Sequence, residues 1–208
     1  TGDSRYLDMT GRHVTFMQQL CLRADGLYRH SPLDESAWGR GNGFPALGLA
    51  LALTETELIL ARPPSDSAAD QTLRAAAERL HAQLLPSLQV HLAALVNHQD
   101  PTGGWRQVID HPGAYRELTA TCMITFALAR GIRAGWIDDE TYRPMVDRAW
   151  EAIQMRVYDD GVLIDVCTGT GKQKSLQDYL DREAILARDV PETVGDSVRS
   201  PRCDVVTN

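Results

Sequence analysis

The chain has 208 residues, of which 43% are hydrophobic and 24% charged, and its 28 acidic against 21 basic residues give a formal net charge of −7. These values are typical of a soluble globular protein, either one domain or part of a larger one, and the acidic balance argues against nucleic acid as a partner. The longest nearly apolar run, residues 44–53, is shorter than the roughly 18 residues that a membrane span requires, so no membrane partner is expected.

The apolar residues recur at helical spacing along most of the chain. They predict an amphipathic helix over residues 8–22 that ends at Gly26, and a Leu- and Ala-rich helix over 44–60 that is buried on most sides. An exposed loop follows at 62–67, where prolines break the pattern and Asp66 or Ser67 can cap the next helix. Residues 68–98 predict a long helix that Pro86 divides or kinks, and residues 117–129 and 141–157 predict two more. The sequence therefore indicates an all-α chain.

A short turn signature recurs three times between the predicted helices, and its copies align on Gly26, Gly104 and Gly161. The copies are separated by about the length of a helix pair with its loops, which predicts a repeated helical hairpin. Each glycine favours a left-handed stop at a helix end, and the β-prone residues that follow favour a short extended rim segment. The alternative is that these common turn dipeptides recur by chance.

The four cysteines, Cys21, Cys122, Cys167 and Cys203, are scattered and form no Cys-x-x-Cys pair. This spacing argues against a zinc ribbon or a dithiol redox site and is typical of buried thiols in a reducing compartment. We therefore expect a cytoplasmic protein, and no secretion leader is recognisable after Thr1.

The densest cluster of chemically useful side chains lies between residues 30 and 44. It combines His30, Trp38, Arg40 and Phe44 with a Gly-Asn-Gly turn directly before the second predicted helix. Arg40 can hold a carboxylate through paired hydrogen bonds, while Trp38 or Phe44 can stack on a sugar face. The cluster suits an acidic carbohydrate; the alternative is a glycine-rich loop whose arginine pairs with a neighbouring helix.

A second cluster contains Trp105, Gln107, Thr119 and Thr121. The two threonines lie at a predicted helix start, where hydroxyl and backbone N–H groups can bind a ligand carboxylate. Capping by Thr119 and core packing of its neighbours explain the same residues without a ligand.

Other motifs predict neither a metal site nor a cofactor. The stretch 169–172 resembles part of a phosphate loop, but Val166 and Gln173 stand where a Walker A motif requires Gly and Ser or Thr. The histidines on the predicted helices lack the i, i+4 pairing of a zinc site, and the acidic pairs at turns are explained by capping.

Five blocks of the sequence resemble glycoside hydrolase family 105, the unsaturated rhamnogalacturonyl hydrolases, and its relative family 88, the unsaturated glucuronyl hydrolases. In chain order they are residues 1–8 (TGDSRYLD), 25–30 (DGLYRH), 38–44 (WGRGNGF), 104–110 (GWRQVID) and 166–171 (VCTGTG). The resemblance implies a partial (α/α)6 toroid over residues 1–188, the C-terminal part of such a domain, with a divergent tail at 189–208. It also places the site at the rim where inner helices begin.

The resemblance implies an unusual glycosidase reaction on the oligosaccharides that polysaccharide lyases release, such as those from pectin. An aspartic acid protonates the C4–C5 double bond of the terminal uronate, water adds at C5, and the resulting hemiketal opens to release the next sugar. By motif, His30 and Arg40 would be catalytic, and the substrate-binding residues would be Trp38, Phe44, Trp105, Gln107, Thr119 and Thr121. Phe44 departs from the family, which commonly has Trp at that place.

The family's catalytic aspartate lies in an Asp-Asp-x-x-Met segment that precedes the first of these blocks, and no segment here matches it. We therefore expect the C-terminal part of a hydrolase whose partner is an unsaturated acidic oligosaccharide. Two alternatives stay open, a non-catalytic carbohydrate-binding helical module and an interaction scaffold of stacked hairpins. The sequence carries no signal of oligomeric state. A full toroid needs about twelve helices, and 208 residues supply only about half of them. We therefore expect the inner helices to present apolar faces that the other half would cover.

Overall fold

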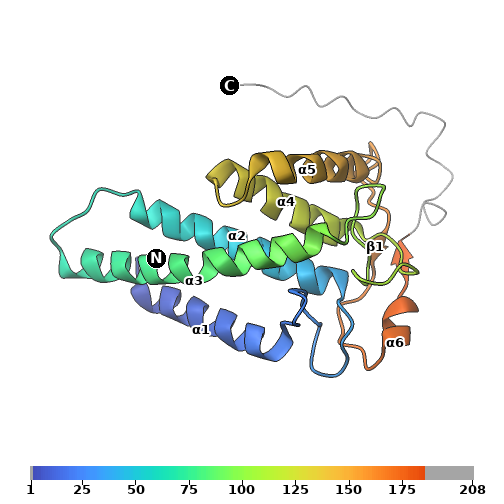
Figure 1. Ribbon diagram of the computed structural model, residues 1–208, viewed down its shortest axis with the longest axis horizontal. Helices are drawn as coiled ribbons and strands as arrows, with labels where there is room; N and C mark the ends of the chain where they lie inside the picture. The colour runs from blue at the N-terminus through green and yellow to red at the C-terminus, as the bar shows by residue number, and fades with distance from the viewer. Residues whose placement is uncertain (1, 186–208) are drawn as a thin grey trace.

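The computed structural model describes residues 2–185, and its main elements are helices (Figure 1), so the all-α prediction is confirmed. The elements are α1 (Ser4–Cys21), α2 (Gly39–Leu60), α3 (Ala68–Val96), α4 (Leu118–Ala134), α5 (Asp139–Gln154), β1 (Val166–Cys167), α6 (Leu176–Leu180) and β2 (Ala184–Ile185). The two short strands pair antiparallel, with Val166 opposite Ile185. The predicted tail at 189–208 lies outside the described residues.

The long helices form part of an (α/α)6 toroid, as predicted. Helices α2 and α4 pack side by side, α3 lies against both, α1 packs on α3, and α5 packs on α4. In α3 the residues Leu84, Leu88, Leu92 and Leu95 are fully buried and recur every three to four positions, so one face of the helix supplies the centre of the core. Each such leucine contributes about 1.5–3 kcal/mol by leaving water.

The helix boundaries differ from those predicted. Helix α1 begins earlier, at Ser4, and ends at Cys21, and α3 continues as one helix past Pro86, so this proline does not divide it. Helix α2 begins at Gly39, so the predicted Gly-Asn-Gly turn is its first turn. This turn packs closely on α4, because a Cβ at Gly43 would lie 2.9 Å from Met123 Cε and 3.4 Å from the Cα of Ala120. Glycine here lets the starts of α2 and α4 approach each other.

The repeated turn is real, but its register differs from the one read in the sequence. Gly26, Gly103 and Gly161 adopt φ values of +84°, +95° and +84°, so the middle copy aligns on Gly103 and not on Gly104. In each copy the glycine N–H donates to the carbonyl three residues earlier, and the N–H of that earlier residue donates to the carbonyl after the glycine. This is a type I turn closed by a bulge at a left-handed glycine. The glycines therefore lie in the turns of the hairpins that follow α1, α3 and α5, and they do not cap these helices.

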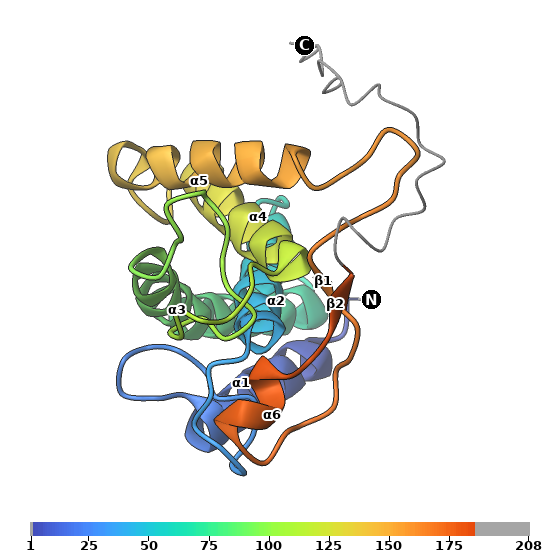
Figure 2. The same cartoon turned by 90° about the vertical axis from the view of Figure 1, so that its right-hand side faces the viewer.

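One end of the molecule gathers these three hairpins, the first turns of α2 and α4, and the segment β1-α6-β2. We call this end, at the right of Figure 1 and facing the viewer in Figure 2, the rim. Isolated β-bridges such as Leu22 to Tyr28 and Val157 to Leu163 give the hairpins their extended character. The rim brings residues 30–44 beside residues 166–185, although more than 120 positions separate them.

Helix α2 carries an exposed apolar stripe of Phe44, Leu51 and Leu58, each about half exposed and seven residues apart. This stripe matches the apolar face that the sequence predicts for an inner helix. The prediction that this helix is buried on most sides is wrong, since only 33% of its apolar window is buried. The helix is also long and apolar enough to cross a membrane by length and composition, so the exclusion based on residues 44–53 was too strict. Core helices pass the same test, and α2 contacts α3 and α4 along its other faces.

Candidate functional site

Trp38 is the centre of the most chemically distinctive cluster at the rim. Its indole is only 2% exposed and stands at the N-cap of α2. The His30 ring lies with its centroid 4.2 Å from that of Trp38, and the guanidinium carbons of Arg40 and Arg182 lie 5.1 and 5.3 Å from the indole centroid. Two cations on one aromatic ring form cation–π contacts, each worth roughly 0.5–2 kcal/mol. The sequence predicted the association of His30, Trp38 and Arg40, and the structure adds Arg182.

The two guanidinium groups converge on one backbone carbonyl. Arg40 Nη2 and Arg182 Nη1 both donate to the oxygen of Gly169, and Arg182 Nη2 also donates to that of Gly171. The ion pairs formed within residues 2–185 involve other arginines, so neither Arg40 nor Arg182 has a carboxylate partner there. Uncompensated positive charge at a partly buried place favours an anionic ligand.

His30 is held neutral by its surroundings. Burial, followed by the charges of Arg182, Lys172 and Arg40, lowers the pKa of the imidazole to about 4. Its Nδ1 lies 2.8 Å from the hydroxyl of Tyr179 in α6. At neutral pH the cluster therefore combines fixed cations with an uncharged imidazole.

A cavity of about 510 Å³ opens beside this cluster, between α1 and α2. His30, Trp38 and Thr170 line its rim end, and Phe44 lines it from α2 with 55% of its surface exposed. Phe44 is thus accessible to a ligand that lies along α2. The other walls are largely apolar.

The second predicted cluster is mostly structural. Trp105 has no exposed surface, belongs to the core, and donates its indole N–H to Leu95 O at 2.8 Å. Thr121 is buried. Its hydroxyl donates to the carbonyl of Glu117 and accepts from the backbone N–H of Trp105. Neither side chain is among the residues that line the cavity, and their role in substrate binding stays a prediction.

Glu117, and not Thr119, caps α4. Its fully buried carboxylate accepts hydrogen bonds from Ala120 N at 2.6 Å, from the Thr119 hydroxyl at 2.7 Å and from Cys167 N at 3.1 Å. Thr119 therefore donates to the cap and is not free to bind a ligand through that proton. The cap also ties α4 to β1.

Gln107 is buried beneath α6. Its side-chain Nε2 donates to Tyr179 O at 2.9 Å, while its Oε1 has no partner within residues 2–185. Trp38 Nε1 and Arg40 Nε are also buried without a partner in the described part of the chain. Buried polar atoms are nearly always paired, so these three atoms are unusual among the described residues.

The family assignment rests on a match along almost the whole chain. The model of Glycosyl Hydrolase Family 88 matches residues 2–189. The chain belongs to glycosyl hydrolase family 88. Among similar proteins, the unsaturated rhamnogalacturonyl hydrolase YesR of Bacillus subtilis is 32% identical over 142 residues, which cover 68% of this chain and 34% of YesR. An unsaturated 3S-rhamnoglycuronyl hydrolase of Formosa agariphila is 30% identical over 60% of this chain and 29% of its own length.

A solved structure from Salmonella enterica serovar Paratyphi A, described as a possible member of GH105 family, matches the fold of this family 88 chain. Its TM-score is 0.70 at 20% identity, with 86% of this chain and 45% of that chain covered. The chain thus spans about a third of these two curated relatives and about half of the solved structure. At this identity the structural match establishes the fold alone.

Two residues of the rim cluster, Tyr179 and Arg182, are not among the site residues that the sequence predicts. Both lie in or just after α6, a helix of five residues that carries no clear periodicity. The only signal was their place shortly after the VCTGTG block, within the part of the chain that resembles the family.

Between residues 2 and 185, no group of three His, Cys, Asp or Glu side chains could hold a metal ion.

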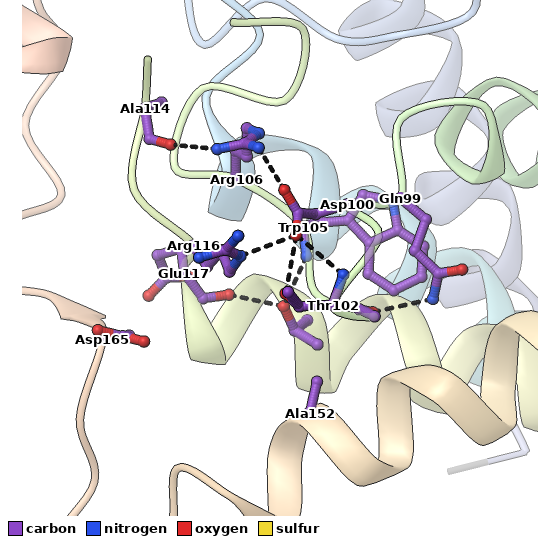
Figure 3. A network of polar contacts seen from close by, with 12 residues as sticks. Gln99, Asp100, Thr102, Trp105, Arg106, Ala114, Arg116, Glu117, Ala152 and Asp165 are labelled. Carbon is purple, nitrogen blue, oxygen red and sulfur yellow. Dashed lines mark hydrogen bonds and ion pairs between the residues drawn. The ribbon is translucent and has the colours of Figure 1, made fainter. Parts of the chain in front are cut away.

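Asp100 braces the rim of this family 88 chain from the turn at Gly103 (Figure 3). Its buried carboxylate forms ion pairs with Arg106 and with Arg116, the latter at 2.8 Å, and accepts from the N–H and hydroxyl of Thr102. Burial alone would raise the pKa of Asp100, but the hydrogen bonds from Thr102 and Arg116 outweigh it and lower the pKa to about 2. The charged form is therefore the one that stabilises the fold.

Replacing Asp100 by asparagine should lower the free energy of unfolding by about 2 kcal/mol at neutral pH, because two charge-assisted contacts are lost. Since the folded pKa lies below that of the unfolded chain, the contribution is present above about pH 4 and is lost as the pH falls towards 2. Urea denaturation at neutral pH and near pH 3 should show the difference between the proteins shrinking in acid. Asp139→Asn, which breaks only an exposed pair with Arg143, serves as the control. An equal difference at both pH values would contradict the prediction.

Proposed function

We propose that this chain forms the uronate-binding part of a glycoside hydrolase that acts on unsaturated uronyl oligosaccharides. The observation that carries the proposal is the pair of guanidinium groups, Arg40 and Arg182, that meet on Trp38 without a carboxylate partner within residues 2–185. A uronate presents one carboxylate on a flat sugar ring. Two arginines can hold the carboxylate, while Phe44 offers an apolar face to a neighbouring sugar.

The chemistry of the wider family supports the same assignment. The relatives from Bacillus subtilis and Formosa agariphila are named as unsaturated rhamnogalacturonyl and rhamnoglycuronyl hydrolases. For this protein we propose hydration of the C4–C5 double bond: a carboxylic acid protonates the double bond, water adds at C5, and the hemiketal opens to release the next sugar. The cationic cluster would hold the uronate while it reacts.

A second candidate is a carbohydrate-binding module without turnover. It is favoured by one observation, that none of the described residues lining the cavity is an aspartate or a glutamate. His30 does not replace such an acid. Because its pKa is lowered to about 4, the imidazole is neutral at pH 7 and carries no acidic proton for the double bond. The two candidates share the binding site and differ only in the proton donor.

The binding site is tested by calorimetry with an unsaturated uronyl disaccharide and with its carboxylate methyl ester. We expect the acid to bind saturably, and the Arg40→Ala and Arg182→Ala variants to lose about 100-fold in affinity, since a charge-assisted hydrogen bond is worth roughly 1.5–3 kcal/mol. Arg79→Ala, at an exposed pair with Asp8, is the matched control and should bind normally. The ester should bind weakly to every protein. Equal affinity for acid and ester would refute the uronate site.

Turnover separates the two candidates. Hydration of the double bond removes its ultraviolet absorbance, so a hydrolase should bleach the disaccharide at a rate proportional to protein concentration. Binding without bleaching by this chain favours the module, and bleaching by it establishes the hydrolase. The absence of both would refute the proposed function.

A further inference from the structure

The hydroxyl of Tyr179 is a buried polar group of the rim that has no role in the proposed reaction. Tyr179 is 1% exposed, yet its hydroxyl has two partners, His30 Nδ1 at 2.8 Å and the backbone N–H of Gln173 at 3.2 Å. Gln107 holds the Tyr179 carbonyl, and the Arg182 guanidinium lies 5.6 Å from the phenol centroid. The phenol is therefore fixed from several sides, and no group of the proposed reaction requires it.

The hydrogen bonds of this hydroxyl determine which nitrogen of His30 carries the hydrogen. The backbone N–H of Gln173 can only donate, so the phenol oxygen accepts from it. The phenol proton then needs an acceptor, and within residues 2–185 the one available is His30 Nδ1. Burial raises the pKa of Tyr179, which keeps that proton in place. If Nδ1 carried a hydrogen instead, a buried hydroxyl proton would be left without a partner, which is unfavourable.

An Nδ1 that accepts leaves the hydrogen of a neutral imidazole on Nε2. That nitrogen forms no hydrogen bond within the described chain, and the His30 ring lines the cavity. The other titratable or charged groups around this ring come from several elements: His13, Cys21 and Arg29 on the α1 side, Asp34 from the loop before α2, whose charge acts on Tyr179, Arg40 from α2, and Lys172, Tyr179 and Arg182 from the segment around α6. The cations among them oppose a second proton on His30.

We propose that Tyr179 is a positioning residue that fixes His30 as its Nε2–H tautomer, so that the rim offers a neutral hydrogen-bond donor to a hydroxyl or ring oxygen of the sugar. The inference rests on the proposed function for the identity of the ligand, but not for the tautomer. It assigns different tasks to neighbouring groups, since Arg40 and Arg182 carry the charge that attracts the carboxylate and His30 carries a directed proton. A neutral donor suits a sugar oxygen, which bears no charge.

The tautomer can be read directly from the histidine-labelled 208-residue chain by two-bond ¹H–¹⁵N correlation, with no sugar present. Between about pH 5 and 8 we expect His30 to show a bare Nδ1 and a protonated Nε2. Tyr179→Phe keeps the ring packing and removes only the hydroxyl, so the tautomers should become mixed. Tyr6→Phe, at an exposed ring on α1, is the control and should change nothing. A protonated Nδ1, a doubly protonated ring at neutral pH, or an unchanged tautomer in Tyr179→Phe would overturn the inference.

Sugar binding supplies the second readout. Tyr179→Phe should weaken binding of the unsaturated disaccharide about tenfold, in keeping with the loss of one oriented hydrogen bond, and should leave the preference for acid over methyl ester intact. His30→Gln, whose amide N–H can stand in for Nε2–H, should retain more affinity than His30→Asn. The predicted tautomer without sugar binding would refute the proposed function alone. Sugar binding with the opposite tautomer would refute this inference alone.

Discussion

Replacing Gly103 by alanine should lower the free energy of unfolding by about 4 kcal/mol or more, a large part of the roughly 5–15 kcal/mol that stabilises a typical domain. Two causes add. The backbone of Gly103 has a φ of +95°, which costs a residue with a side chain roughly 1–2 kcal/mol. A Cβ would also lie within overlap distance of the Arg148 carbonyl in α5, which is backbone and cannot rotate away. The turn and α5 would have to separate.

Gly161 provides the matched control, because it occupies the same place in the third copy of the turn. Its φ is +84°, but a Cβ there would meet nothing within 4 Å. Gly161→Ala should therefore show the cost of the left-handed backbone alone, about 1–2 kcal/mol. Urea denaturation of the two variants compares them, with thermal unfolding as a second measure if Gly103→Ala is poorly soluble. Equal losses in both variants would show that the approach to α5 does not matter.

The same two glycines show what the sequence can reveal about this fold. Local signals predicted the turns, since an acidic or polar residue before glycine between two helical patterns is readable from the chain alone. The register of the middle copy was wrong, because Gly103 and Gly104 are equally permissive and only the contact with Arg148 distinguishes them. Periodicity predicted the helices in the same way, whereas the start of α2 at Gly39 depends on how closely α4 approaches.

The candidate site likewise contains residues that the local sequence reveals and residues that only the fold brings together. His30, Trp38 and Arg40 are close in the sequence and could be grouped by their chemistry. Tyr179 and Arg182 could not, because they reach the cluster through a five-residue helix anchored by Gln107. Trp105 shows the opposite difficulty: an indole near a rim turn can stack on a sugar or fill the core, and here it is buried against α3.

Glu117 connects the fold to the site. Its carboxylate caps α4 and also receives the N–H of Cys167 in β1, the strand that leads into Gly169, where Arg40 and Arg182 meet. The acid is fully buried, and its charge is balanced by N–H and hydroxyl donors at a helix N-terminus. A single side chain thus fixes the distance between an inner helix and the segment that supplies Tyr179 and Arg182.

Replacing Glu117 by alanine should lower the free energy of unfolding by about 3 kcal/mol, because a helix cap and a bond to β1 are lost together and their buried donors are left without partners. Hydrogen exchange should also show that the amide of Cys167 loses protection, and calorimetry should show weaker binding of the unsaturated disaccharide. Asp138→Ala is the matched control, since Asp138 caps α5 through Thr141 N at an exposed place away from this contact. It should cost less stability and leave both the Cys167 amide and sugar binding unchanged. Equal effects of the two substitutions would reduce Glu117 to an ordinary helix cap, and the rim would then need another explanation for the position of Arg182.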